Sequence, residues 1–187
     1  MIDLYTSATP NGYKVSILLE ELKIPYNVFA IDLVAKDQKK PDYLKLNPNG
    51  RIPTIVDHDN NDFVVFESGA ILIYLAEKSG HFFPTDPKVR SSVLQWLMFQ
   101  MASVGPMMGQ VHTFVHYQGG ENIEASERYV NETKRIYSVM DKQLAKREYF
   151  LDWGYSIVDI AIFPWVGRCD WQTIDLNEYP NVKRWYL

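Results

Sequence analysis

The sequence is poor in cysteine: among its 187 residues only Cys169 carries a thiol. One cysteine cannot form an internal disulfide, a thiolate zinc site or a C-x-x-C redox pair. His112 and His116 stand four residues apart, but no acidic companion and no third ligand accompany them, so we expect no metal site. Any thiol chemistry would therefore use a sulfur atom that the chain does not supply.

The sequence also lacks an excess of basic residues and any long apolar run. The 19 Lys and Arg residues are outnumbered by 23 Asp and Glu residues, which gives a formal net charge of -4. The basic residues are scattered along the chain, which argues against nucleic acid as a partner. No apolar run has the length of a membrane span, and the first residues show no signal-peptide pattern. We expect no membrane partner and a cytoplasmic location.

What the sequence contains, in its first part, is an alternation of strand and helix patterns. Apolar periodicity and turn residues predict strands at residues 2–5 and 26–31 around a helix at 12–22, then a short helix at 41–46, strands at 54–57 and 63–66, and a helix at 68–79. The first strand–helix–strand unit predicts a parallel pair with a right-handed crossover. The polar residues between the last two strands predict an antiparallel hairpin.

Beyond residue 80 every long segment has a helical pattern. The predicted helices cover residues 88–103, 125–146, 156–168 and 180–187, and Ser156 and Asp159 form a capping box at the start of one of them. Residues 80–87 contain two prolines and no periodicity. We therefore expect one domain at residues 1–80, a linker at 81–87 and an all-helical domain at 88–187.

Three loops in the first part carry candidate binding groups. Thr9-Pro10-Asn11-Gly12 follows a parallel strand and begins a helix, where exposed amides and the helix dipole favour an anion and lower the pKa of a bound thiol. A hydroxyl at Thr9 or an amide at Asn11 could donate to that sulfur. The alternative, which the pattern alone favours, is that both residues cap the helix and shape a turn.

The second loop is Asn47-Pro48-Asn49-Gly50-Arg51-Ile52-Pro53, which ends in a proline directly before a strand. Such a proline indicates either an edge strand or a cis bond that would leave the Ile52 backbone to pair with an extended peptide. The third loop contains Glu67 and Ser68 at a strand-to-helix junction. Ser68 could bind a carboxylate and Glu67 an ammonium group, whereas the simpler alternative is a helix cap with a favourable charge.

Together and in this order, these segments resemble the cytosolic glutathione transferases. More narrowly they are similar to the Nu class, bacterial relatives of the fungal nitrogen-regulator type that act as glutathione-dependent disulfide reductases. The resemblance covers nearly the whole chain and is carried by Met1-Ile2-Asp3-Leu4-Tyr5, Thr9-Pro10-Asn11-Gly12-Tyr13-Lys14, Leu46-Asn47-Pro48-Asn49-Gly50-Arg51-Ile52-Pro53, Phe66-Glu67-Ser68-Gly69-Ala70-Ile71-Leu72, Leu94-Gln95-Trp96, Gly105-Pro106-Met107, Glu127-Arg128-Tyr129 and Tyr155-Ser156-Ile157-Val158-Asp159-Ile160-Ala161. It implies an α/β thioredoxin-like N-terminal domain of order β-α-β-α-β-β-α and an all-α C-terminal domain.

The resemblance also implies roles for single residues. Thr9 and Asn11 would be catalytic and contact the glutathione sulfur. Ile52 would pair with the cysteinyl backbone beside a cis Pro53. The other implied glutathione contacts are made by Gln38 and Arg128, and by Glu67 and Ser68 at the γ-glutamyl group. Tyr5 and Ser7 resemble thiol-activating residues of other classes, and we treat them as secondary.

The sequence therefore predicts an enzyme, a glutathione transferase with disulfide reductase activity that uses glutathione, reduced or as its disulfide, as cosubstrate and no metal. Its partners would be a small disulfide or an apolar electrophile, and the family leads us to expect a homodimer. Two alternatives stay open: conjugation of glutathione to apolar electrophiles, and a non-catalytic binding or regulatory module. Members usually continue beyond the final helix, whereas this sequence ends at Leu187, so a truncated helical domain is a further expectation.

Overall fold

The computed structural model describes residues 1–187 and divides into two compact units, residues 1–83 and 84–187. The first unit is built on a four-stranded sheet in the order β2-β1-β3-β4. Its strands are β1 (Ile2–Thr6), β2 (Tyr26–Ala30), β3 (Thr54–Asp57) and β4 (Phe63–Phe66). Strand β1 pairs in parallel with β2 and antiparallel with β3, and β3 pairs antiparallel with β4. The predicted strand–helix–strand unit and the hairpin are thereby confirmed.

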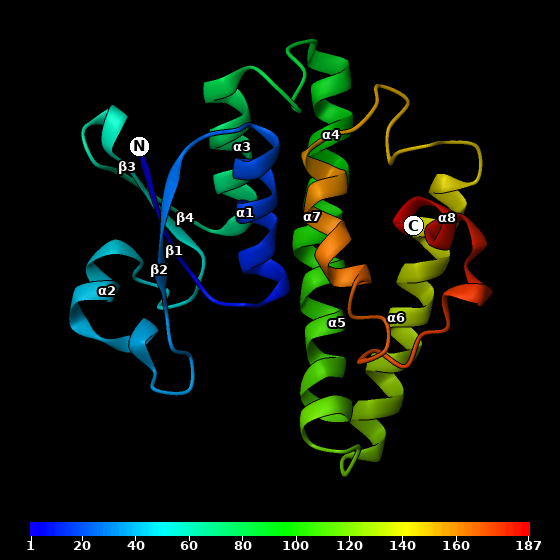
Figure 1. Ribbon diagram of the computed structural model, residues 1–187. Helices are drawn as coiled ribbons and strands as arrows, with labels where there is room; N and C mark the ends of the chain where they lie inside the picture. Colours follow the sequence, from blue (N-terminus) through cyan, green and yellow to red (C-terminus); the bar gives the residue numbers. More distant parts are fainter. The chain divides into compact units, whose positions relative to one another are not determined.

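Helices cover both faces of this sheet. In Figure 1, α1 (Pro10–Glu21) and α3 (Ser68–Ser79) lie on one side of the strands, and the short α2 (Pro41–Leu46) lies on the other. The core between the sheet and the helix pair is mostly aliphatic, because apolar side chains point inward from both layers. Its fully buried members include Leu4, Leu18, Leu19, Ile55, Ile71 and Leu72. On the other face, the Tyr5 ring stacks on Phe29 at 4.8 Å and meets Tyr43 of α2 edge-on.

The strand register decides which loops meet. Tyr5 pairs with Thr54, and Thr54 pairs with Phe66, so these three residues form one row across the sheet. The row at the opposite end joins Ile2, Asp57 and Phe63. Since chain direction alternates from β1 to β3 to β4, the loop after β1, the loop before β3 and the junction after β4 all emerge at the Tyr5 end. We call this the loop end of the sheet, and the other the hairpin end.

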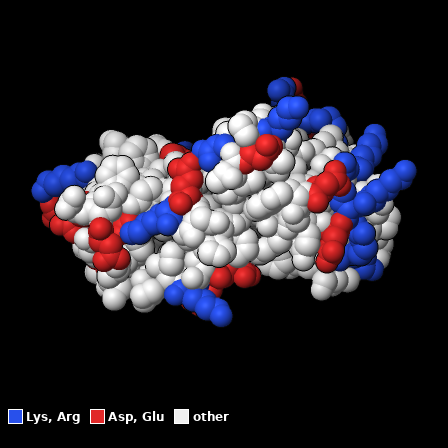
Figure 2. Space-filling view, turned by 90° about the horizontal axis from the view of Figure 1, so that it is seen from above, with Lys and Arg blue, Asp and Glu red and all other residues white.

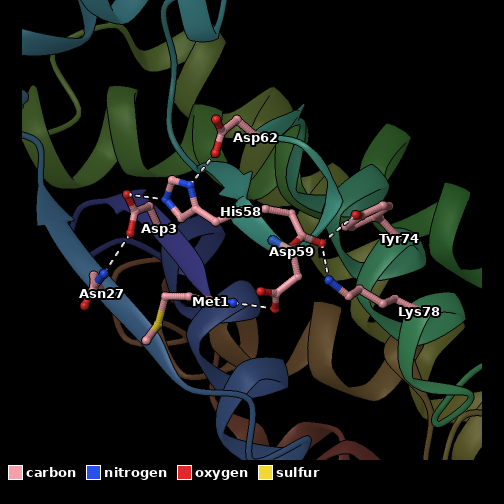
Figure 3. A network of polar contacts seen from close by, with 9 residues as sticks. Met1, Asp3, Asn27, His58, Asp59, Asp62, Tyr74 and Lys78 are labelled. Carbon is pink, nitrogen blue, oxygen red and sulfur yellow. Dashed lines mark hydrogen bonds and ion pairs between the residues drawn. The ribbon is translucent and has the colours of Figure 1, made fainter.

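A network of ion pairs and hydrogen bonds connects the residues at the hairpin end (Figure 3). The His58 ring lies between two carboxylates, 2.9 Å from Asp3 and 2.5 Å from Asp62. The buried Asp57 carboxylate accepts from the Tyr74 hydroxyl at 2.6 Å and forms an ion pair with Lys78. Tyr74 and Lys78 both belong to α3, so these two contacts tie that helix to the end of β3.

The second unit is helical. One long helical path runs through α4 (Pro87–Phe99), a π-helical turn at Gln100–Val104, α5 (Gly105–Val111) and a second π-helical turn at His112–Tyr117. It is followed by α6 (Ile123–Leu144), α7 (Ile157–Val166) and α8 (Pro180–Tyr186). None of the helices has the length and apolar character to span a membrane. The α/β thioredoxin-like fold followed by an all-α region, predicted from the sequence, is confirmed.

The sequence pattern predicted that the first helix of this unit ends at residue 103, and that end is wrong. Gly105-Pro106 follows closely, and such a pair is typical of a helix end, because proline removes a backbone donor and crowds the preceding turn. In the structure the wider π-helical turn ends at Val104, directly before α5, and Pro106 occupies the first turn of α5. A π turn re-spaces the backbone bonds and is a known way to accommodate such an interruption without ending the helix.

The predicted capping box is present. Ser156 accepts from the Val158 amide at 3.2 Å, and the Asp159 carboxylate accepts from the Ser156 amide at 3.0 Å. Asp159 also accepts from the Phe150 amide and from the Trp185 indole. Burial raises the pKa of this carboxyl group while the hydrogen bonds oppose that shift. Asp159 is therefore a structural residue that joins α7, α8 and the preceding loop.

Candidate functional site

The start of α1 sets the first part of the site. Thr9 is the N-cap residue, and its hydroxyl oxygen accepts from the Gly12 amide at 3.3 Å. Gly12 is required here because a Cβ atom would lie 2.3 Å from the Ser7 carbonyl oxygen. The predicted capping interpretation of Thr9 is thus correct, and it leaves the hydroxyl proton of Thr9 to donate elsewhere.

Asn11 lies in the first turn of α1 and is half-buried. Its side chain has no hydrogen-bond partner within the chain. An amide group beside a helix N-terminus can donate to an anion, and the helix dipole adds to the attraction. Thr9 and Asn11 therefore both have a proton to offer at the loop end of the sheet.

The loop before β3 is held by Asn47, which is buried. Its side-chain amide donates to the Arg51 carbonyl at 2.8 Å and its oxygen accepts from the Asn49 amide at 3.0 Å. The peptide bond between Ile52 and Pro53 is cis. Neither the amide nor the carbonyl of Ile52 has a hydrogen-bond partner within the chain. These groups can therefore pair with an extended peptide, as a further edge of the sheet would.

Gln38 lies next to this loop because of Gly50. Gly50 has a φ of +59°, and a Cβ atom there would lie 2.9 Å from the Gln38 carbonyl oxygen. The side-chain oxygen Oε1 of Gln38 is buried without a hydrogen-bond partner. A buried unpartnered acceptor is uncommon, and one explanation is a donor that arrives with a ligand.

The junction between β4 and α3 supplies Glu67 and Ser68. Glu67 has a φ of +69°, a conformation that non-glycine residues seldom adopt, and its carboxylate accepts from the Asn49 side chain at 3.0 Å. Ser68 begins α3 and is buried. Its hydroxyl oxygen accepts from the Lys14 ammonium group at 3.2 Å. A strained backbone held by tertiary contacts is a recurrent feature of binding sites.

Lys14 is the residue that the sequence interpretation missed. It follows Pro10 by four residues and precedes Leu18 by four, so it occupies the buried face of α1. Only 1% of its surface is exposed. Burial lowers the pKa of Lys14 to about 7, while the charge of Glu67 acts in the opposite direction. The sequence did contain a signal for Lys14: a lysine at a position of the first helix whose neighbours on the same face are apolar.

The structure thus brings six of the eight predicted site residues to the loop end of the sheet: Thr9, Asn11, Ile52, Pro53, Glu67 and Ser68. Gln38 joins them through Gly50. Arg128 lies in the second unit, exposed on α6, where it helps line a hollow of about 550 Å³ together with Met107, Tyr129, Asn131, Glu132 and Arg135.

Cys169, His112 and His116 belong to the second unit and are not among the groups at the loop end of the sheet. Burial raises the pKa of the Cys169 thiol, which makes it a poor nucleophile at neutral pH. His112 is buried against the Trp165 ring, and desolvation lowers its pKa to about 4. The His116 ring stacks on Trp171 at 3.9 Å. The two histidines and the two tryptophans form an aromatic cluster of the helical unit.

The charged surface is mixed. Figure 2 shows acidic and basic side chains interspersed over the visible face, without a broad area of one sign. A surface of this kind does not favour a polyanion. The polar groups that remain to be explained are those at the loop end of the sheet.

Comparisons with known proteins agree with this geometry. Residues 2–77 match the family described as the glutathione S-transferase N-terminal domain, and residues 123–187 match the glutathione S-transferase C-terminal domain. Disulfide-bond oxidoreductase YfcG of Escherichia coli is 45% identical over 190 residues, which cover 100% of this chain and 88% of that protein. Disulfide-bond oxidoreductase YghU of the same organism is 36% identical over 98% of this chain and 69% of its own length.

Solved structures give the same result. A glutathione transferase from Pseudomonas putida, crystallised with one glutathione disulfide per subunit, superimposes with a TM-score of 0.92 at 42% identity, covering 99% of this chain and 84% of that one. A family member from Pseudomonas fluorescens with two glutathione molecules bound also has a TM-score of 0.92, at 43% identity, covering 99% of this chain and 86% of the other. On these matches, the chain belongs to the glutathione S-transferase family.

Proposed function

We propose that this chain is a glutathione-dependent disulfide oxidoreductase. It binds glutathione at the loop end of the N-terminal sheet and uses the glutathione sulfur as the nucleophile. The observation that carries the proposal is the strand register, which collects the Thr9–Asn11 loop, the Ile52 backbone and the Glu67–Ser68 junction at one end of the sheet. The names of the two Escherichia coli relatives support it.

Each group has a part in this binding. The free amide and carbonyl of Ile52 pair with the cysteinyl backbone of glutathione, and the unpartnered oxygen of Gln38 accepts from the peptide. Ser68, at the N-terminus of α3, binds the γ-glutamyl carboxylate, and Glu67 binds the neighbouring ammonium group. Arg128 makes a further contact with the tripeptide, and the protein acts as a homodimer.

The chemistry follows from the start of α1. The Thr9 hydroxyl and the Asn11 amide donate to the glutathione sulfur, and the helix dipole adds a positive potential, so the thiolate is favoured near neutral pH. That thiolate attacks one sulfur of a small disulfide, a new sulfur–sulfur bond forms, and the departing thiolate takes up a proton. A second glutathione thiolate then attacks the mixed disulfide, which releases the reduced substrate and leaves glutathione disulfide.

The only protein thiol supports glutathione as the source of sulfur. Cys169 lies in the second unit, outside the loops described above, and burial raises the pKa of its thiol. A thiol with a raised pKa is mostly protonated at neutral pH and attacks disulfides slowly. The proposed reaction therefore needs no cysteine from the protein.

The test is a turnover assay with glutathione and a small hydroxyalkyl disulfide, run beside conjugation of an aryl halide at the same enzyme concentration. We expect disulfide reduction to exceed conjugation. Thr9→Ala and Asn11→Ala should each lower disulfide turnover by about 10- to 100-fold, because each removes a donor to the developing thiolate.

Ser16→Ala is the matched control, since Ser16 is a hydroxyl of the same helix whose proton goes to the Tyr13 carbonyl. Its turnover should equal that of the parent. Parental turnover in both Thr9→Ala and Asn11→Ala would refute the assignment of the thiolate donors. Conjugation without disulfide reduction would instead identify a conjugating transferase, and silence in both assays would identify a binding module.

A further inference from the structure

The burial of the Lys14 ammonium group is unfavourable for the stability of the fold. Lys14 is 1% exposed on the face of α1 that packs against α3, and the positions around it on that face are Pro10, Val15, Leu18 and Leu19. An ammonium group loses much of its hydration energy at such a position, so burial must be offset by a nearby favourable interaction. A methionine of similar length would fill the same space without that cost.

One contact of Lys14 points to the ligand site. Its ammonium nitrogen lies 3.2 Å from the Ser68 hydroxyl oxygen, and Ser68 is the first residue of α3. Lysine has donors and no acceptor, so the Ser68 oxygen accepts in this bond and the Ser68 proton points away from Lys14. A carboxylate bound to the Ser68 hydroxyl would then lie about 4–6 Å from the ammonium nitrogen, within the range in which opposite charges stabilise one another.

The charge next to Lys14 is compatible with such a partner. Glu67, the residue before Ser68, is the charged group that acts on Lys14, and it favours the ammonium form. Desolvation opposes it and brings the pKa of Lys14 to about 7. A lysine in this state is partly neutral in the free protein and becomes fully charged when a second negative group arrives, by taking one proton from solvent.

We infer that Lys14 is a positioning residue for the α-carboxylate of the γ-glutamyl group, acting through the Ser68 hydroxyl. It supplies the positive charge that makes the site prefer a γ-glutamyl peptide to one that lacks this carboxylate. The inference rests on the proposed glutathione site and adds the charge that determines its specificity.

The experiment compares two ligands, both methylated on sulfur so that no thiol ionises. They are S-methylglutathione and the same peptide with γ-aminobutyrate in place of γ-glutamate, which lacks only the α-carboxylate. In Lys14→Met the affinity for S-methylglutathione should fall about 10-fold, because one charge interaction at about 5 Å is lost. The affinity for the decarboxylated peptide should stay within about 2-fold of the parent, since that ligand has no carboxylate to lose. Lys14→Arg, which keeps the charge, should retain most of the preference.

A second measurement needs no variant. Calorimetric titration of the parent protein at about pH 8, in two buffers of different ionisation enthalpy, should show uptake of about half a proton or more with S-methylglutathione and none with the decarboxylated peptide. It keeps the inference testable even if Lys14→Met does not fold.

The outcomes separate the two claims. If the parent does not bind S-methylglutathione, the proposed function fails and the inference fails with it. If the parent binds, but Lys14→Met weakens both ligands equally, Lys14 has only a structural role and the inference alone is overturned. Absence of proton uptake together with an unchanged preference would overturn it as well.

Discussion

The two ends of the N-terminal sheet each hold a lysine, and they treat its charge in opposite ways. At the hairpin end, Lys78 of α3 pairs with the buried Asp57 carboxylate, and this hydrogen bond raises the pKa of Lys78 (Figure 3). At the loop end, Lys14 of α1 donates to the Ser68 hydroxyl, and burial lowers its pKa to about 7. The first lysine is 35% exposed along its side chain and the second is almost completely buried.

The difference separates stability from binding. Asp57 needs Lys78, because a buried carboxylate without a cation would be strongly unfavourable. Ser68 has no such need for Lys14, since a hydroxyl is readily satisfied by a neutral partner. The Lys78 charge at the hairpin end therefore stabilises the fold. The Lys14 charge at the loop end destabilises the free protein and, in our inference, strengthens the binding of a ligand. The same substitution at both lysines should have effects of opposite sign.

The largest effect is expected for Lys78→Met. The variant leaves the Asp57 carboxylate buried without its cation, although the Tyr74 hydroxyl and the Asp59 amide still donate to it. Because Lys78 is partly exposed, we expect less than the loss of about 3–5 kcal/mol that is typical of broken buried pairs, namely about 2 kcal/mol in the free energy of unfolding. Urea denaturation at pH 7 measures it.

Lys45→Met is the control for that comparison. Lys45 also pairs with an aspartate, Asp42, but both side chains are largely exposed, at 75% and 94%. Removing such an exposed pair should leave the free energy of unfolding nearly unchanged, because water screens the interaction. An equal loss in Lys78→Met and Lys45→Met would show that the burial of Asp57 does not matter.

A smaller effect of opposite sign is expected for Lys14→Met, which should stabilise the free protein by about 1 kcal/mol at pH 7. The variant removes a buried charge, and this gain exceeds the lost hydrogen bonds of the ammonium group. The folded-state pKa of about 7 lies below the ordinary value of 10.5, so the unfolded chain binds more protons between these values.

The free energy of unfolding of the parent, relative to that of Lys14→Met, therefore rises as the pH rises from about 7 toward 10. It falls as the pH falls over the same range. Urea denaturation of both proteins at about pH 7 and pH 9 should show the advantage of the variant lost or reversed at the higher pH. A destabilised variant, or a difference that does not depend on pH, would place Lys14 in the same class as Lys78.

The smallest effect concerns His58, which is exposed at the hairpin end. Hydrogen bonds to Asp3 and Asp62 raise the pKa of His58 above its ordinary value. The protonated ring stabilises the fold fully when the pH is below the unfolded-state pKa of about 6.5. This stabilisation is lost as the pH rises through the folded-state pKa. His58→Gln should therefore be less stable than the parent at about pH 5.5 and approach it at about pH 8.5.

Urea midpoints of the two proteins at both pH values are the measurement. A gap between parent and His58→Gln that is constant over this range would mean that the His58 charge contributes nothing and that only its packing counts. The loop end should show no response to this substitution, so glutathione affinity is a convenient internal check.

Much of this arrangement could be predicted from the sequence. Strands β3 and β4 lie at the predicted residues, because turn residues on both sides bound them. Thr9 and the Ser156–Asp159 capping box are local signals, and both are found as caps. The path from α4 to Tyr117 could not be predicted, because a π-helical turn has no periodicity of its own and Gly105-Pro106 is typical of a break.

The sequence by itself determined the order of elements, the family and the loops that carry the candidate ligand groups, since each depends on residues near one another in the chain. Only the tertiary structure decided which loops share one end of the sheet, because that depends on strand register. Tertiary packing likewise decided the fates of two lysines that look alike in sequence. It placed Lys78 beside a buried carboxylate and Lys14 within hydrogen-bond distance of the Ser68 hydroxyl. The free energy of a charged group depends on its surroundings and not only on its residue type.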